Sequence, residues 1–195
     1  MPVLRMNLPP GQSGGPDDRV ENCILEMARG EKQGLADLYE KTQSAVYGYA
    51  LSILKNRADA EDVLQDTYLQ LWRAAGSYQA QGRPLAWIFT IARNLALQRL
   101  REQKRVVTAG PEDWPELFAG EAEDSREDRL TLSLLMEALS DEERQIVMLH
   151  AVAGFRHRET AVLMGLSLPA VLSRYSRAMK KLRNAWKEAD GYDKP

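Results

Sequence analysis

The chain has 195 residues, of which 44% are hydrophobic and 28% are charged, a composition typical of soluble globular proteins. This length allows one or two small domains, each with its own hydrophobic core. The formal net charge of only −2 would by itself argue against binding to nucleic acid. Cys23 is the only cysteine and there are two histidines, so we expect no intramolecular disulfide, no zinc or other metal site, and no cofactor.

No apolar run approaches the roughly 18 residues of a membrane span, and the N-terminus lacks the core of a signal peptide. We therefore expect a cytoplasmic protein without direct membrane insertion. Charge is segregated along the chain: residues 83–105 carry six basic residues and one acid, whereas residues 104–129 carry four basic residues and eight acids. Because local charge attracts phosphate, the low net charge does not exclude nucleic acid.

Apolar residues spaced three or four apart predict an all-α protein with two small helical domains. A Pro-, Gly- and Ser-rich start and an acidic, Pro-containing middle segment indicate the boundaries. We expect a disordered tail over residues 1–18, a first domain over 19–104, a flexible acidic linker over 105–129, a second domain over 130–188 and a tail over 189–195.

The first domain begins with a short helix that stops at Gly30 and a longer helix that ends near Asn56. Cys23 lies on the apolar stripe of the short helix, so we interpret it as a buried structural thiol. Asp59 is predicted to cap a third helix over residues 60–75. Leu69 lies in the middle of the polar and acidic outer face of that helix.

Burial of a leucine against a partner contributes about 1.5–3 kcal/mol, so we interpret the face around Leu69 as a docking surface for another protein. Single exposed leucines are common, which leaves an ordinary solvated face as the alternative. The outer face consists of Asp62, Gln65, Asp66, Leu69, Gln70 and Arg73, with Trp72 near its edge.

A polar loop containing Tyr78 leads to Pro84, which is predicted to open a fourth helix that runs to about Gln103. An aromatic and hydrogen-bonding row on this helix can stack an unpaired base and hold a single strand. The alternative is that Trp87 packs under the neighbouring loop. The row consists of Trp87, Asn94, Gln98 and Arg101, flanked by Arg93 and Arg99.

In the second domain, a helix over residues 130–139 precedes Ser140, and Glu143 three residues later completes the pattern of a capping box. Residues 155–186 form the pattern of a helix-turn-helix: a first helix over about 158–164, Gly165 in the turn and Ser167 as the next N-cap. Between residues 154 and 187 there are eight Lys or Arg and one acid. A basic helix behind a tight turn fits the DNA major groove, and an ordinary solvated helix is the alternative.

The two helical modules, in this order, resemble a bacterial sigma factor of the sigma-70 family, most closely the extracytoplasmic-function (ECF) class. Residues 59–73 (DAEDVLQDTYLQLWR) look like the segment that grips the clamp helices of the RNA polymerase β′ subunit. Residues 84–96 (PLAWIFTIARNLA) look like the promoter-melting and minus-ten segment. Residues 139–182 look like the minus-thirty-five module, although Leu172 stands where the family often has a basic residue.

The resemblance implies a promoter-specificity subunit that binds core RNA polymerase and promoter DNA and melts the minus-ten region, without catalytic residues of its own. It also implies control by an anti-sigma factor. The implied polymerase contacts are Asp62, Gln65, Asp66, Leu69 and Trp72. The implied minus-ten contacts are Tyr78, Trp87, Arg93, Asn94, Gln98 and Arg101. The implied minus-thirty-five contacts are Arg158, Ala170, Ser173, Arg174, Arg177 and Lys181.

Three other interpretations account for less of the sequence. An autonomous helix-turn-helix regulator would leave the face around Leu69 unexplained. A decoy that only sequesters an anti-sigma factor would need neither the Trp87 row nor the basic helix. An enzyme is disfavoured because no nucleophile, paired carboxylate or phosphate-binding loop stands out. His157, beside the helix-turn-helix, is interpreted as an exposed bystander, with a phosphate contact as the alternative.

Overall fold

The computed structural model describes residues 16–103 and 135–191. The predicted linker over residues 105–129 and most of the two predicted tails lie outside these residues. Within them, every regular element is a helix, which confirms the all-α class. The elements are α1 (Pro16–Ala28), α2 (Lys32–Leu54), α3 (Arg57–Ala74), η1 (Ala75–Ser77), α4 (Pro84–Gln103), α6 (Asp141–Val147), η3 (Met148–Val152), α7 (His157–Met164) and α8 (Leu168–Gly191).

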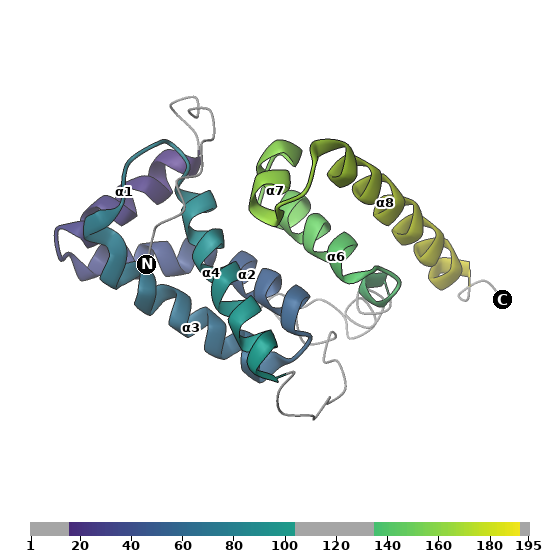
Figure 1. Ribbon diagram of the computed structural model, residues 1–195, viewed down its shortest axis with the longest axis horizontal. Coiled ribbons are helices and arrows are strands. Elements are labelled where there is room, and N and C mark those ends of the chain that lie inside the picture. Colours follow the sequence, from purple (N-terminus) through teal and green to yellow (C-terminus); the bar gives the residue numbers. More distant parts are fainter. Residues whose placement is uncertain (1–15, 104–134, 192–195) are drawn as a thin grey trace.

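The helices form two groups, which Figure 1 shows side by side. The first group, α1 to α4, is built around α2, which packs against the other three helices. The second group consists of α6, α7 and α8, with α8 along its outer edge. Residues 135–137, just before α6, are the helical part of the predicted 130–139 helix that the structure describes. We call the two groups the first and second modules.

Helix ends follow local backbone chemistry, and one predicted cap is wrong. Helix α3 begins at Arg57 because the side chain of Asn56 accepts a hydrogen bond from the Asp59 backbone N–H at 3.0 Å. Asp59 is therefore not the cap. Its carboxylate instead accepts a hydrogen bond from Arg99 Nε at 2.6 Å, which ties α3 to α4. Helix α1 begins at Pro16, three residues before the predicted domain boundary at residue 19.

Helices α1 and α2 approach very closely at Gly34. A Cβ atom added there would lie 2.6 Å from the Cys23 carbonyl oxygen and 2.7 Å from Glu26 Cβ. Both distances are shorter than real Cβ contacts, so only glycine permits this spacing. The close approach lets Ile24 of α1 and Leu38 of α2 reach full burial in the shared core.

The two modules pack directly against each other. The ring of Phe89 on α4 meets the ring of Phe155, which precedes α7, edge to face with centroids 5.1 Å apart. Beside this contact, Arg83 Nη1 pairs with Glu159 Oε1 at 2.8 Å. Both aromatic residues belong to one continuous cluster of buried residues. The sequence predicts two domains but gives no sign of this packing between them.

Replacement of Gly34 by alanine tests the close approach of α1 and α2. We expect Gly34→Ala to lower the free energy of unfolding by about 1–3 kcal/mol, because the added methyl group must push backbone apart. Gly76→Ala is the matched control, since a Cβ atom at Gly76 meets nothing within 4 Å. Urea denaturation measures both changes, and equal effects of the two substitutions would contradict the assignment.

Candidate polymerase and promoter DNA interfaces

The outer face of α3 is exposed as the sequence predicts. Asp62, Gln65 and Asp66 are exposed, and Leu69 is 52% exposed in their midst. Trp72 is half-buried and packs against the core of the first module. Asp62 Oδ2 also accepts a hydrogen bond from Arg99 Nη2 at 2.7 Å, so one of the acids is held by α4. The result is an apolar side chain in water, surrounded by acidic and amide groups.

Tyr78 and Trp87 lie together where the loop before α4 folds back on the helix. Their rings are 4.8 Å apart, and both residues are half-buried. One side of the Trp87 ring is therefore covered by the loop, as the alternative interpretation of this residue supposed.

A residue that the sequence analysis did not single out holds this loop. Glu21 Oε1 accepts hydrogen bonds from the Tyr78 hydroxyl at 2.7 Å and from the Gly82 backbone N–H at 3.2 Å. Burial and the bond to Glu21 raise the pKa of Tyr78, so the phenol remains protonated. Glu21 and Tyr78 are 57 positions apart, and no local sequence pattern connects them.

The remainder of the predicted row on α4 divides into exposed and inward residues. Asn94, Gln98 and Arg101 are exposed on successive turns. Arg101 Nε donates to the Leu97 carbonyl oxygen at 3.0 Å, which holds its guanidinium along the helix. Burial raises the pKa of Tyr49, and half-buried Arg93 lies close enough to the Tyr49 hydroxyl to oppose part of that rise. Arg93 therefore points toward the core and not outward with the predicted row.

Helices α7 and α8 form the predicted helix-turn-helix. Gly165 ends α7 in the left-handed region with φ of 68°, and the Ser167 side chain accepts a hydrogen bond from the Ala170 backbone N–H at 3.3 Å. Val171 and Ala178, on the inner face of α8, are fully buried. Of the predicted DNA contacts, Arg158, Ser173, Arg177 and Lys181 are exposed, whereas Ala170 and Arg174 are half-buried.

Three of the predicted DNA-binding side chains on α8 form ion pairs with the first turn of α6. Arg174 Nε lies 2.5 Å from Glu142 Oε2, and Lys181 Nζ lies 2.6 Å from Glu143 Oε2. Arg177 Nε is 3.8 Å from the other oxygen of Glu143. The predicted capping box of Ser140 and Glu143 is present, so the same carboxylate both caps α6 and binds α8. The basic face is thus partly neutralised within the protein.

Both histidines of the chain lie in this module, against the α8 residue Tyr175. The rings of His150 and His157 stack with centroids 4.1 Å apart, and Tyr175 lies 4.8 Å from each ring. His157 is half-buried, so its interpretation as an exposed bystander was wrong. Burial, followed by the neighbouring His150, lowers the pKa of His157 below its usual value of 6.5.

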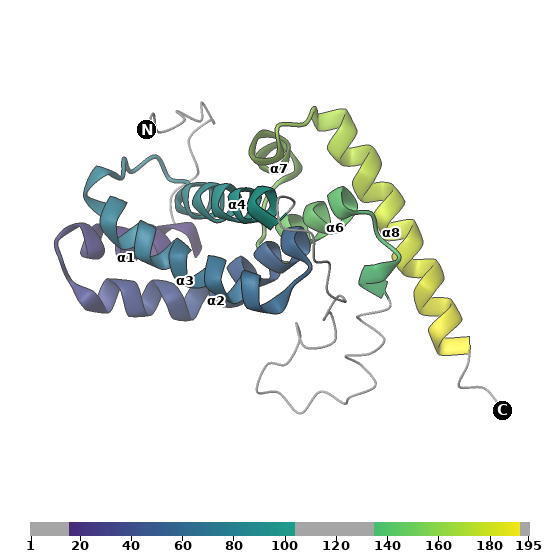
Figure 2. The same ribbon diagram turned by 60° about the horizontal axis from the view of Figure 1, so that its bottom comes forward.

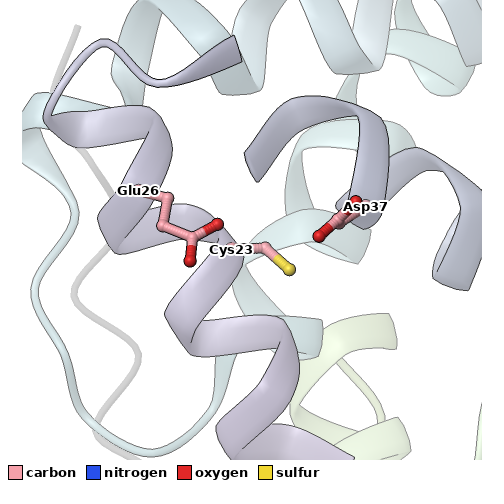
Figure 3. Close-up of side chains that lie close together, drawn as sticks. All are labelled: Cys23, Glu26 and Asp37. Atoms are coloured by element: carbon pink, nitrogen blue, oxygen red, sulfur yellow. The ribbon is translucent and has the colours of Figure 1, made fainter. Parts of the chain in front are cut away.

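One group of potential metal ligands is found among the described residues, at the contact of α1 and α2 (Figure 3). The ligand atoms of Cys23, Glu26 and Asp37 lie within 4.8 Å of one another. Burial raises the pKa of the Cys23 thiol, which keeps it protonated, and Asp37 already accepts a hydrogen bond from Gln33 Nε2 at 2.7 Å. These features favour the interpretation of Cys23 as a structural thiol, enclosed by the close approach at Gly34.

Comparison with known proteins identifies the family. Residues 38–106 match Sigma-70 region 2, and residues 129–182 match Sigma-70, region 4. The ECF RNA polymerase sigma factor SigK of Mycobacterium ulcerans is 30% identical over 187 residues, which cover 92% of this chain and 97% of that protein. The chain therefore belongs to the sigma-70 family, in its ECF group.

Two solved structures have the same fold. CnrH in complex with the cytosolic domain of CnrY has a TM-score of 0.61 at 24% identity and covers 88% of this chain and 99% of that chain. The sigma factor RpoE in complex with the anti-sigma factor NepR, from Bartonella quintana, has a TM-score of 0.64 at 24% identity, with coverages of 80% and 96%.

As a sigma factor, the protein is a promoter-specificity subunit of bacterial RNA polymerase, and its partners are core polymerase and promoter DNA. Sigma factors are in general initiation subunits without enzymatic activity. Among residues 16–103 and 135–191, no helix combines the length and apolar character needed to cross a membrane.

The lowered pKa of His157 predicts that the protein loses stability in mild acid. As the pH is lowered below about 6.5, the unfolded chain binds a proton at this histidine more readily than the folded protein does. The free energy of unfolding therefore decreases as the pH decreases. His157→Phe keeps an aromatic ring against His150 but removes the titration. We expect its unfolding free energy to change less than that of the wild type between pH 7.5 and 5.5 in urea denaturation. Parallel losses in both proteins would exclude this role.

Proposed function

We propose that the outer face of α3 is the surface that binds core RNA polymerase. The observation that supports this most strongly is Leu69, a large apolar side chain that is 52% exposed among acidic and amide groups. Its burial in a complex contributes about 1.5–3 kcal/mol, and the flanking carboxylates favour a basic partner surface. The proposed contacts are Asp62, Gln65, Asp66, Leu69 and Trp72.

We propose that α4 and its preceding loop bind the melted minus-ten region. Asn94, Gln98 and Arg101 offer hydrogen bonds and charge to a single strand, and the half-buried ring of Trp87 offers an aromatic surface for stacking. Tyr78 supports Trp87 and is itself held by Glu21. Arg93, which lies beside Tyr49, would contribute positive potential from a half-buried position. Extrusion of a base costs a few kcal/mol and stacking returns about 1–3 kcal/mol, so melting also needs the polymerase.

We propose that α8 recognises the minus-thirty-five element in the major groove. Ser173 and Arg174 lie in its N-terminal half, where a recognition helix meets base edges, and Arg158 on α7 is placed to meet the backbone. The proposed contacts are Arg158, Ala170, Ser173, Arg174 and Arg177. Lys181, which the family resemblance also implied, is instead held by Glu143.

Use of both DNA surfaces requires the modules to separate. The two promoter elements are about 25 base pairs apart, or about 85 Å at 3.4 Å per base pair. A compact chain of this length has a radius of gyration of only about 16 Å. Leu69 is 52% exposed while the modules are packed together, and α3 lies away from α8 in both views (Figures 1 and 2). Binding of polymerase at Leu69 therefore does not require the modules to separate first.

We further propose that an anti-sigma factor controls the protein in the cytoplasm, and that the protein performs no covalent chemistry. The structure of RpoE with the anti-sigma factor NepR supports such a partner, because it has the same fold. Recovery of core polymerase but no inhibitor in a pull-down from the native cell would contradict this part of the proposal.

The face around Leu69 is tested by the substitution Leu69→Glu. A charged side chain at the centre of the contact should weaken binding to core polymerase at least tenfold, because a buried charge without a partner is strongly unfavourable. Leu25→Glu on α1 is the matched control, since Leu25 is also exposed, at 38%. Binding to purified core polymerase is measured by fluorescence anisotropy, with circular dichroism as the check of folding. Wild-type affinity of the Leu69 variant would refute the assignment.

Run-off transcription with core polymerase on the DNA upstream of the protein's own gene tests the whole proposal. We expect initiation at a defined site only when the protein is present, and weak binding of the free protein to the same duplex. Strong binding without polymerase, with no effect on initiation, would instead indicate an autonomous regulator.

A further inference from the structure

Glu143, in the first turn of α6, is a buried carboxylate that faces the recognition helix. Its side chain is only 5% exposed, and its Oε2 atom accepts hydrogen bonds from Lys181 Nζ at 2.6 Å and from the Ser140 backbone N–H at 3.0 Å. Burial raises the pKa of Glu143, but the bonds from Lys181 and Ser140 outweigh this effect and leave the pKa below the usual value of 4.5. The carboxylate is therefore charged at neutral pH.

The two close ion pairs between α6 and α8 differ in their surroundings. The Glu142 side chain, which binds Arg174, is 53% exposed, so water replaces the arginine readily when Arg174 turns to DNA. Glu143 has no such access to water. Departure of Lys181 would leave a buried negative charge with one backbone N–H and with Arg177 at 3.8 Å. Such a loss is far more costly than the separation of an exposed pair.

We propose that Glu143 is a positioning residue for promoter recognition, which holds Lys181 and keeps its charge away from the DNA phosphates. This inference rests on the proposed use of α8 at the minus-thirty-five element. Phosphate contacts by Lys and Arg strengthen binding to any sequence, whereas base contacts distinguish sequences. By holding Lys181, Glu143 limits binding to unrelated DNA and leaves the N-terminal half of α8, with Ser173 and Arg174, to select the promoter.

The substitution Glu143→Gln separates the charge of this residue from its capping role. A glutamine at this position also accepts the Ser140 backbone N–H, so the capping box survives. Glu31→Gln is the matched control, because it makes the same change in net charge between α1 and α2, away from the proposed contacts, where Glu31 pairs with Arg29 at 2.7 Å. Each full-length variant is assembled with core polymerase. Binding to the promoter duplex and to an unrelated duplex of equal length is then measured at several salt concentrations.

We expect Glu143→Gln to steepen the plot of log affinity against log salt by about 0.9, the effect of one added phosphate contact. A fourfold rise in salt then weakens binding about 3.5-fold more than in the wild type. Its preference for the promoter duplex over the unrelated duplex should also fall, whereas Glu31→Gln should match the wild type. Addition of Lys181→Met to Glu143→Gln should restore the wild-type slope, because the freed lysine is the source of the change.

A wild-type slope in Glu143→Gln would overturn the inference. Lys181→Met alone provides a second test that does not depend on the folding of the Glu143 variant. We expect its salt slope to be unchanged, and a loss of about 0.9 would show that Lys181 binds phosphate in the native complex. If the wild-type assembly itself does not prefer the promoter duplex, the proposed role of α8 fails and the inference falls with it. If the wild-type assembly prefers the promoter duplex and Glu143→Gln keeps the same preference, the inference is overturned while the proposed role of α8 stands.

Discussion

The contact of Phe89 with Phe155 joins the two modules that the structure describes. Phe89 lies within the segment of α4 that resembles the promoter-melting region, and Phe155 lies just before the helix-turn-helix. Their burial in one cluster places the two DNA-binding modules side by side and fixes Arg83 against Glu159. The proposed binding surfaces are therefore described in the state in which the two modules are packed together.

The features that depend on local sequence could be predicted. Gly165 ends α7, Ser140 and Glu143 form the capping box and Pro84 opens α4, because each effect acts within one helical turn. The prediction of the α3 cap was wrong because Asn56 and Asp59 are both good capping residues. Only the backbone conformation, which is extended at Asn56, decides between them.

The sequence could predict which helix faces form the candidate sites. It could not predict the hydrogen bonds and ion pairs that link those faces to other helices. The exposure of Leu69 follows from its position in a helical period, and the turn before α8 follows from Gly165 and Ser167. The bond of Glu143 to Lys181 joins residues 38 positions apart. Such a pairing depends on how helices cross in the folded chain, and periodicity within one helix contains no information about it. The count of basic residues consequently overestimates the charge that α8 offers to DNA.

The forces that hold the modules together are of unequal strength. The Arg83 and Glu159 side chains are 13% and 21% exposed, so separation of the modules would return much of their lost hydration and offset the broken ion pair. The pair consequently gives orientation more than stability. The aromatic contact has no such compensation, because its rings gain nothing favourable from water. An edge-to-face pair adds about 0.5–1.5 kcal/mol to the effect of burial. Exposure of the apolar surface around Phe155 is thus the main free-energy cost of separating the modules. The free energy of binding to polymerase and to two distant promoter elements has to exceed that cost.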